Sequence, residues 1–195
     1  MKKFELVTEM TKEVFGKKLF RIRALISFGD VNKGDLGGWV GKEGNLSQKG
    51  NAWVYGDARV YGDARVYGNA RVFGDAWVYG NAQVYGNAWV YGNAQVYGNA
   101  WVYGNAWVYG NARVFGDAHY ITINPIGSEG GTLTAFRQKD NSIMVNRGCF
   151  SGTIEEFEEA VNQTHGENKH GQVYRALIPV IKLRLDEISV TGDSE

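Results

Sequence analysis

Twelve consecutive six-residue units span residues 50–121, and most read Gly-[Asn/Asp]-Ala-[Trp/Arg/Gln]-Val-[Tyr/Phe]. In a unit such as Ala52-Trp53-Val54-Tyr55, small apolar and larger residues alternate, so the side chains fall on opposite faces of a strand. The Gly-Asn and Gly-Asp pairs suit the bend between strands, because these residues tolerate positive φ. The repeat predicts a solenoid in which each unit is one strand and one corner.

A strand of about four residues cannot bury its inner face alone, so successive units must wind into coils stacked about 4.8 Å apart. We therefore expect a parallel β-helix with alanine and valine inside. The period leaves the handedness open, and the statistics of crossover connections favour a right-handed coil.

The pattern Val-x-Gly-[Asn/Asp]-Ala-x over residues 50–121 resembles the hexapeptide repeat of left-handed β-helices. This resemblance implies about four triangular coils of three units each, a mainly β fold. Residues eighteen apart would then stack in columns along the outside. One departure from the family is that Tyr or Phe follows the inward Val, where a small or acidic residue is usual.

The columns would place aromatic side chains on all three outer sides, and two interpretations coexist. Stacked rings would stabilise a thin core, at about 0.5–1.5 kcal/mol per aromatic pair. So much outward aromatic area would also mark a face for a partner or a second copy. The second interpretation predicts a partner or oligomer surface containing Trp53, Trp77, Trp89, Trp101, Trp107, Tyr91 and Tyr109.

Composition excludes several classes of protein. The 195 residues have a formal net charge of +0 and are 44% hydrophobic, without the long apolar run of a membrane span. Neither duplex nucleic acid nor a membrane is an expected partner. The first residues lack the apolar core of a signal peptide, and the one cysteine, Cys149, suits a reducing compartment, so we expect a cytoplasmic protein.

The flanks predict covers for the open ends of the solenoid. We expect an N-terminal β cap over residues 1–43, the β-helix over 44–123 and a small C-terminal α+β domain over 124–195. In the first, residues 4–9 and 19–25 should pair around a turn containing Gly16, Lys17 and Lys18. Trp39 should plug the first coil, and residues 44–49 form a degenerate repeat.

The C-terminal domain should contain a hairpin and two helices. Residues 132–137 and 142–146 suit the hairpin. Thr153 and Glu156 form a capping box that opens a helix to about residue 163. A second helix over 172–185 has an apolar stripe of Leu177, Val180, Ile181 and Leu185, with Pro179 in its middle.

A glycine-punctuated segment that leads into the first helix is the candidate ligand site, because a helix N-terminus attracts anions. An arginine on a neighbouring strand would bind phosphate or carboxylate. The simpler alternative is a tight turn with a helix cap. The predicted anion or nucleotide site comprises Arg137, Arg147, Gly148, Cys149, Ser151, Gly152, Thr153 and His165.

Catalytic and metal chemistry is weakly indicated. Cys149 with His165 could act as thiol and base, although nothing local pairs them and a buried structural cysteine is simpler. His165 and His170 flank Glu167, yet a polar loop between helices explains them. We expect no metal, no cofactor and no catalytic residue.

Hexapeptide solenoids are familiar from acyltransferases and one class of carbonic anhydrase, both typically trimeric. In those acyltransferases the base is usually a solenoid histidine, and His119 is the one histidine in these repeats. In those anhydrases the histidine ligands lie in the solenoid, whereas His165 and His170 lie beyond it. A trimeric acyltransferase-like enzyme therefore stays an alternative, as does a purely structural scaffold.

The flanks together resemble those of uncharacterised hexapeptide-repeat proteins of bacteriophages and prophages. Residues 34–39 before the repeats, and residues 148–153 and 164–166 after them, carry this resemblance. It implies an accessory phage protein in the host cytoplasm that counters a bacterial defence system. We therefore expect a non-catalytic homo-oligomer, with a trimer favoured, that either sequesters a nucleotide-like ligand or blocks a host defence protein.

Overall fold

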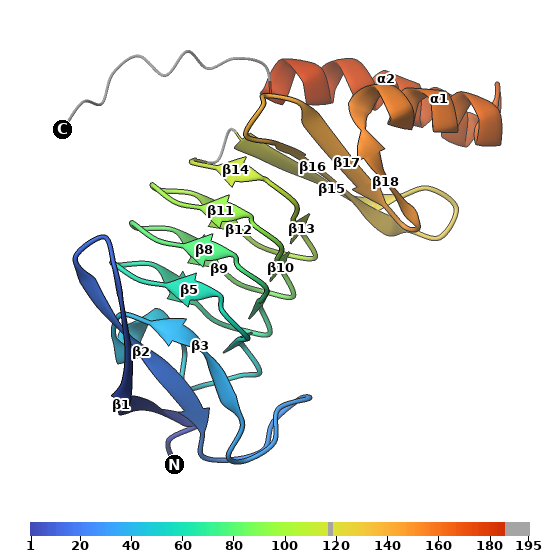
Figure 1. The fold of residues 1–195 in the computed structure, drawn as a ribbon. Helices are drawn as coiled ribbons and strands as arrows, with labels where there is room; N and C mark the ends of the chain where they lie inside the picture. The colour runs from blue at the N-terminus through green and yellow to red at the C-terminus, as the bar shows by residue number, and fades with distance from the viewer. Residues whose placement is uncertain (117–118, 186–195) are drawn as a thin grey trace. The chain divides into compact units, whose positions relative to one another are not determined.

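The computed structural model describes residues 1–116 and 119–185, and the chain divides into two compact units, Met1–Asp117 and Ala118–Glu195 (Figure 1). The first unit is a parallel β-solenoid of about four turns with a sheet at its N-terminal end. The second is an antiparallel sheet with two helices.

The solenoid strands are only two residues long and recur every six residues. Each pairs in parallel with the strand eighteen residues away, as Trp89 does with Arg71 and Trp107. The strands form three ladders, which we name after an early member: the Trp53, Arg59 and Arg65 ladders. The Trp53 ladder contains β4 (Trp53–Val54), β7 (Arg71–Val72), β10 (Trp89–Val90) and β13 (Trp107–Val108); the Arg59 ladder contains β5 (Arg59–Val60), β8 (Trp77–Val78), β11 (Gln95–Val96) and β14 (Arg113–Val114); the Arg65 ladder contains β6 (Arg65–Val66), β9 (Gln83–Val84) and β12 (Trp101–Val102).

The predicted parallel β-helix and its columns are confirmed. Alanine and valine of the repeats line the interior, where they are completely or almost completely buried. Asparagine side chains at the corners also stack, since Asn69 Nδ2 donates to Asn87 Oδ1 and Asn87 Nδ2 to Asn105 Oδ1, each at 3.1 Å. The coils are therefore held together by backbone, side-chain amide and apolar contacts in register.

Three strands close the N-terminal end: β1 (Phe4–Val14), β2 (Lys17–Ala24) and β3 (Leu36–Val40). β2 pairs antiparallel with β1 on one side and with β3 on the other, and β3 then pairs in parallel with β5 of the Arg59 ladder. The predicted hairpin exists but is longer, because Lys17 and Lys18 belong to β2 and only Phe15 and Gly16 form the turn.

The prediction that Trp39 plugs the first coil is wrong. Trp39 pairs with Arg59, so it occupies an outward position of that ladder, and its Nε1 donates to Asp57 Oδ1 at 3.2 Å. Leu46, which is buried, aligns with the inward Val66 in the first coil, and Phe4 packs against Trp53. Leu46 bridges to Val66, which places the degenerate repeat, with the short 3-10 helix Glu43–Asn45, at the start of the Arg65 ladder.

Lys3 is a buried cation at this end, with only 2% of its surface exposed. Its Nζ donates to the carbonyl oxygens of Ala52 at 2.8 Å and Gly50 at 3.3 Å, and lies 4.9 Å from the ring centroid of Phe28. Burial penalises the charged form and lowers the pKa of Lys3 to about 8.

This shifted pKa predicts a pH dependence of stability. Between about pH 8 and pH 10 the unfolded state binds more protons than the folded state at Lys3, so the free energy of unfolding should rise with pH. Burial also raises the pKa of five tyrosines, to about 12 for Tyr55 and Tyr79, and these oppose the rise as unfolded tyrosines ionise near pH 10; the other three are Tyr61, Tyr67 and Tyr91. Urea denaturation at about pH 7.5 and about pH 9.5 measures the rise.

The Lys3→Met variant provides the control, because it keeps an unbranched apolar stem without the titrating group. All six tryptophans lie before residue 118, so their fluorescence follows the solenoid unit alone. We expect the variant to lose the rise in the free energy of unfolding. An equal rise in both proteins would assign it to another group.

The second unit has a four-stranded antiparallel sheet in the order β15 (Tyr120–Ile126), β16 (Gly131–Arg137), β17 (Ile143–Arg147), β18 (Phe150–Thr153). The helices α1 (Ile154–His165) and α2 (Lys169–Leu185) follow and pack with the sheet around Leu133, Val145 and Phe157. The predicted hairpin and both helices are confirmed. The predicted domain limit at 123/124 lies inside β15, because that strand pairs with β16 on both sides of the limit, at Ile123 and at Ile126.

The apolar stripe of α2 differs in part from the prediction. Ile178, Ile181 and Leu185 face the core with Tyr174, and Leu177 packs against its edge, whereas Val180 is exposed. The predicted stripe did not include Tyr174, which is 4% exposed. Its hydroxyl accepts a hydrogen bond from Arg147.

Candidate functional site

The predicted aromatic surface does not form one face. Trp53 is not on the surface: it is 1% exposed and packs edge-on against Phe4 and Phe28, whose ring centroids lie 6.1 and 5.4 Å away. The N-terminal cap covers Trp53, whereas the repeat pattern alone predicts that Trp53 is as exposed as the other outward residues. Trp77 is contacted edge-on by Phe15 of the hairpin turn, at 5.5 Å between centroids.

Most of the rings that remain outside stack on one another along the solenoid, although Trp101 has Gln83 as its ladder neighbour and makes no ring contact with the described residues. Tyr91 stacks on Tyr109 at 4.9 Å between centroids with 12° between planes, and Trp89 on Trp107 at 5.2 Å with 9°. Stacking occupies ring faces and leaves mainly edges outward. Trp107 and Trp101, at 39% and 45% exposure, belong to different ladders. The contacts therefore favour the structural interpretation of the aromatic columns.

The predicted C-terminal ligand segment is a hairpin turn and a strand. Gly148, at φ 57°, and Cys149 connect β17 to β18, and Ser151 and Gly152 pair with β17 inside the sheet. Gly152 cannot frame a cavity there, because a Cβ on it would lie 2.6 Å from the Glu156 carboxylate. The glycines serve the turn and close packing, as the simpler alternative states.

Both arginines of the predicted site bind parts of the protein. Arg147 donates from Nε to the Tyr174 hydroxyl at 3.0 Å and from a terminal nitrogen to the carbonyl oxygen of Ile126 at 2.8 Å. Arg137 donates to the carbonyl oxygen of Leu185, at the C-terminus of α2. Their donors connect sheet and helices, so the predicted anion site is not assembled by these residues.

The helix N-terminus is also occupied. Glu156 N donates to Thr153 Oγ1 at 3.2 Å, and Glu156 Oε2 accepts from Thr153 N at 2.7 Å, which confirms the capping box. A carboxylate therefore sits where an anion would bind. His165 ends the same twelve-residue helix, about 18 Å from Thr153 at 1.5 Å rise per residue, next to His170 and Tyr174.

Cys149, His165 and His170 are the residues whose types suggested thiol or metal chemistry. The prediction of a buried structural cysteine is wrong: Cys149 is an exposed free thiol, because it lies in the turn between β17 and β18. Within residues 1–116 and 119–185, no group of three or more His, Cys, Asp or Glu side chains is placed to hold a metal ion. His165 and His170 have ring centroids 6.1 Å apart, at the junction of the two helices.

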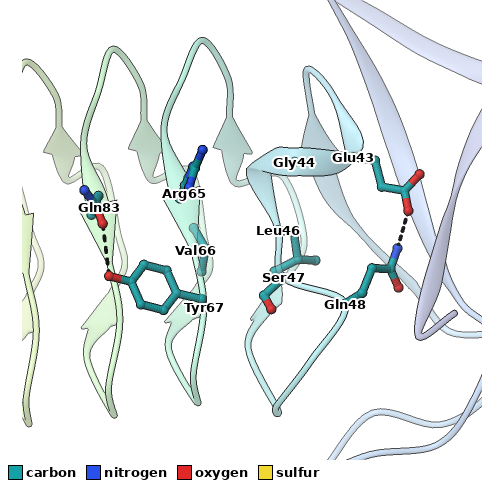
Figure 2. A pocket seen from close by; sticks show the side chains of 9 residues that line it. All are labelled: Glu43, Gly44, Leu46, Ser47, Gln48, Arg65, Val66, Tyr67 and Gln83. Atoms are coloured by element: carbon teal, nitrogen blue, oxygen red, sulfur yellow. Dashed lines mark hydrogen bonds between the residues drawn. The ribbon is translucent and has the colours of Figure 1, made fainter. Parts of the chain in front are cut away.

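A pocket of about 740 Å³ lies beside the Arg65 ladder, at the first coil of the solenoid (Figure 2). The degenerate repeat supplies one wall, with Glu43, Ser47 and Gln48. The next two coils supply the other, with Arg65, Tyr67 and Gln83. Its volume falls in the range typical of small-molecule sites.

The pocket exists because the first coil lacks an outward side chain. Asn45 aligns with Arg65, one residue before the bridge from Leu46 to Val66. The Asn45 side chain is completely buried and donates to the carbonyl oxygens of Gly62 at 3.1 Å and Ala64 at 2.7 Å. Gly44 beside it has open space where a Cβ would stand. Arg65 therefore has no side chain stacked on its N-terminal side.

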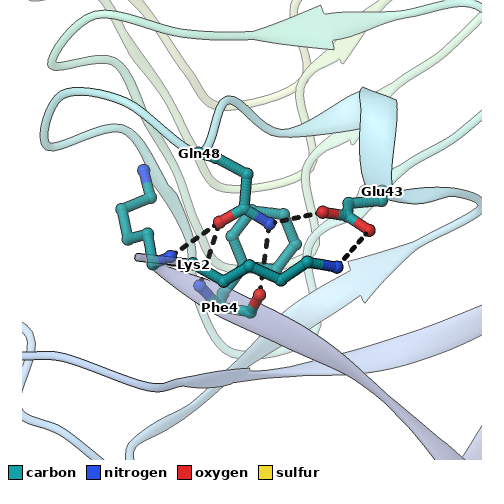
Figure 3. A network of polar contacts seen from close by, with 5 residues as sticks. Lys2, Phe4, Glu43 and Gln48 are labelled. Carbon is teal, nitrogen blue, oxygen red and sulfur yellow. Dashed lines mark hydrogen bonds and ion pairs between the residues drawn. The ribbon is translucent and has the colours of Figure 1, made fainter.

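The outer wall is braced by Gln48, whose amide pairs with the edge of β1 (Figure 3). Gln48 Oε1 accepts from the backbone nitrogens of Lys3 at 2.7 Å and Phe4 at 3.2 Å, and its Nε2 donates to Phe4 O at 3.1 Å. Nε2 also donates to Glu43 Oε1 at 2.9 Å. Lys2 Nζ donates to Glu43 Oε2 at 3.0 Å, and this hydrogen bond is the main cause that lowers the pKa of the Glu43 carboxyl.

Sequence reasoning missed this pocket. The available signal was the irregular unit over residues 44–49, which replaces the large outward residue of the repeat with Asn45. Where one outward side chain is missing from a column, a gap is expected beside the next side chain of that column, which here is Arg65. Whether a gap stays open depends on where the flanking segment packs, and that is a long-range contact.

Comparison with known proteins supports the solenoid. A family model described as the YdcK beta solenoid repeat matches residues 52–66, 64–80, 82–96 and 94–110. Among curated proteins, none matches the chain. The match covers the wall with Arg65, Tyr67 and Gln83 and omits the wall formed by residues 43–48. In the part of the chain that the structure describes, no helix is long and apolar enough to cross a membrane.

Proposed function

We propose that this protein is a non-catalytic, homo-oligomeric binding protein whose ligand occupies the pocket beside the Arg65 ladder. The supporting observation is a small-molecule-sized pocket with an exposed arginine and a braced outer wall, at the point where the repeat is interrupted. The sequestration hypothesis is kept, and its site moves from the C-terminal segment to the solenoid.

Finer features of this proposal rest on resemblance. The solenoid is a left-handed hexapeptide β-helix, the assembly is a trimer, and the protein is a phage-type accessory protein of the host cytoplasm that counters a defence system. The blocking of a host protein by an aromatic face is less favoured, because stacking occupies the ring faces. The transferase and scaffold alternatives rest on the fold alone and gain no specific contact in their support.

Native mass spectrometry of protein purified gently from its natural host tests the proposal. We expect an oligomer, with three subunits favoured, that retains a small molecule. The Gly44→Trp variant should lose that mass, because the indole would fill the pocket from a position with open space and an ordinary φ.

The Gly116→Trp variant is the matched control, since Gly116 is equally open but does not line the pocket. It should retain the ligand. Equal retention in wild type and both variants would place the ligand elsewhere, and a wild-type protein without bound mass would argue against the proposal. A monomer that retains the ligand would contradict only the proposed oligomeric state.

A further inference from the structure

We infer that the pocket beside the Arg65 ladder selects a small oxyanion, either a carboxylate or a phosphate group. This inference rests on the proposed function and assigns the chemical class of its ligand. It comes from a comparison of the hydrogen-bond acceptors and donors that line the pocket. Most of the acceptors are engaged within the protein, whereas three donor groups, on Arg65, Gln83 and Ser47, are left for a ligand.

Apart from the Tyr67 hydroxyl oxygen, each side-chain acceptor on the lining already receives a hydrogen bond from the protein. Gln83 Oε1 accepts from the Tyr67 hydroxyl at 3.0 Å, and Ser47 Oγ accepts from Lys49 N at 3.0 Å. Both oxygens of Glu43 are used, by Lys2 and Gln48. The Gln48 carbonyl oxygen accepts from the backbone of β1.

The donors of the pocket remain. Arg65 makes no hydrogen bond or ion pair with any residue that the structure describes, and it is exposed. The nearby Asp63 makes its ion pair with Lys42 at 2.6 Å, and Arg65 attracts that carboxylate only through space, as the smallest of the causes that lower the pKa of Asp63. A guanidinium offers five N–H donors in a planar fork that matches the oxygens of a carboxylate or phosphate.

Register brings a second donor beside Arg65. Arg65 pairs with Gln83 in the parallel ladder, so the two side chains lie about 4.8 Å apart along the coils. Because Tyr67 holds Gln83 Oε1, the Gln83 NH2 group turns away from Tyr67 (Figure 2). The Ser47 hydroxyl on the opposite wall can donate as well. These donors suit an anion better than a cation, because the Glu43 carboxylate on the opposite wall is already paired with Lys2.

Titration of the full-length, arginine-15N-labelled protein with inorganic phosphate, and separately with acetate, tests the inference. We expect a saturable shift of the Arg65 Nε–H resonance with at least one of these anions. Arg65→Gln should weaken the apparent Kd for that anion by about tenfold or more, because a charge-assisted hydrogen bond is lost. The Gln83→Glu variant should weaken it similarly, since it keeps an acceptor for Tyr67 but replaces the donor with a negative charge.

The Arg113→Gln variant is the control. Arg113 has the corresponding outward position in the Arg59 ladder, makes no hydrogen bond or ion pair with the described residues, and does not line the pocket. It should change the Kd less than twofold. Equal weakening by Arg113→Gln and Arg65→Gln would mean general charge attraction and overturn the inference.

The tests separate this inference from the proposed function. If Gly44→Trp removes the ligand seen by mass spectrometry while Arg65→Gln retains it, the pocket binds a molecule that is not recognised as an anion. If Gly44→Trp retains the ligand, the pocket itself is refuted. Phosphate saturating without acetate assigns a phosphate group, and the reverse assigns a carboxylate.

Discussion

Replacing Trp53 with alanine is expected to lower the free energy of unfolding of the solenoid unit by about 3–5 kcal/mol. Trp53 is 1% exposed, and its indole fills the space between Phe4, Phe28 and the first coil. The truncation would leave a cavity at the junction of the cap and the repeats. Neighbouring strands are paired and have little freedom to collapse into it.

Trp101→Ala is the matched control, because it removes the same side chain from a similar outward strand position. Trp101 is 45% exposed, so we expect a loss below about 1 kcal/mol. Urea denaturation followed by tryptophan fluorescence compares the two variants, since five tryptophans remain in each. Equal losses would mean that the cap contributes nothing specific at Trp53.

Replacing Gly86 with alanine should destabilise the middle of the solenoid more than the same change at Gly104. Both glycines have positive φ, 70° and 67°, so each variant incurs the cost of a left-handed conformation, about 1–2 kcal/mol. A Cβ on Gly86 would also lie 2.9 Å from Gly104 N and 3.1 Å from Gly104 O, whereas one on Gly104 meets nothing within 4 Å.

The extra contact at Gly86 involves backbone, which cannot rotate away as a side chain does. We expect a further loss of about 1–3 kcal/mol for Gly86→Ala relative to Gly104→Ala. The same fluorescence-detected denaturation measures the difference. Indistinguishable midpoints and slopes would show that the coils can separate locally at little cost.

The sequence repeat was sufficient to predict the solenoid and its columns. A strict six-residue pattern gives every unit the same local choice between strand and corner, and stacking then follows from the need to pair each short strand. Ala88 and Val90 face inward and Tyr91 stacks on Tyr109, as that argument requires. The capping box at Thr153 was equally local and equally readable.

The C-terminal site could not be judged from the sequence, because its residues have partners that are distant along the chain. Arg147 reaches the carbonyl oxygen of Ile126 and the Tyr174 hydroxyl, and Arg137 reaches the carbonyl oxygen of Leu185. A glycine-rich segment before a helix looks the same in sequence whether its charges face solvent or bind the protein. Only tertiary contacts assign the donors.

By itself, the sequence determined the period, the inward and outward positions, and the stacking of residues eighteen apart. The tertiary structure decided how the end of the array differs from its middle. Trp53 and Trp101 occupy similar positions in the repeat, yet only Trp53 lies under the cap, and Arg65 borders a pocket because Asn45 turns inward. The physical reason is that repetition specifies contacts between neighbouring coils, whereas the ends are completed by segments far away in the chain.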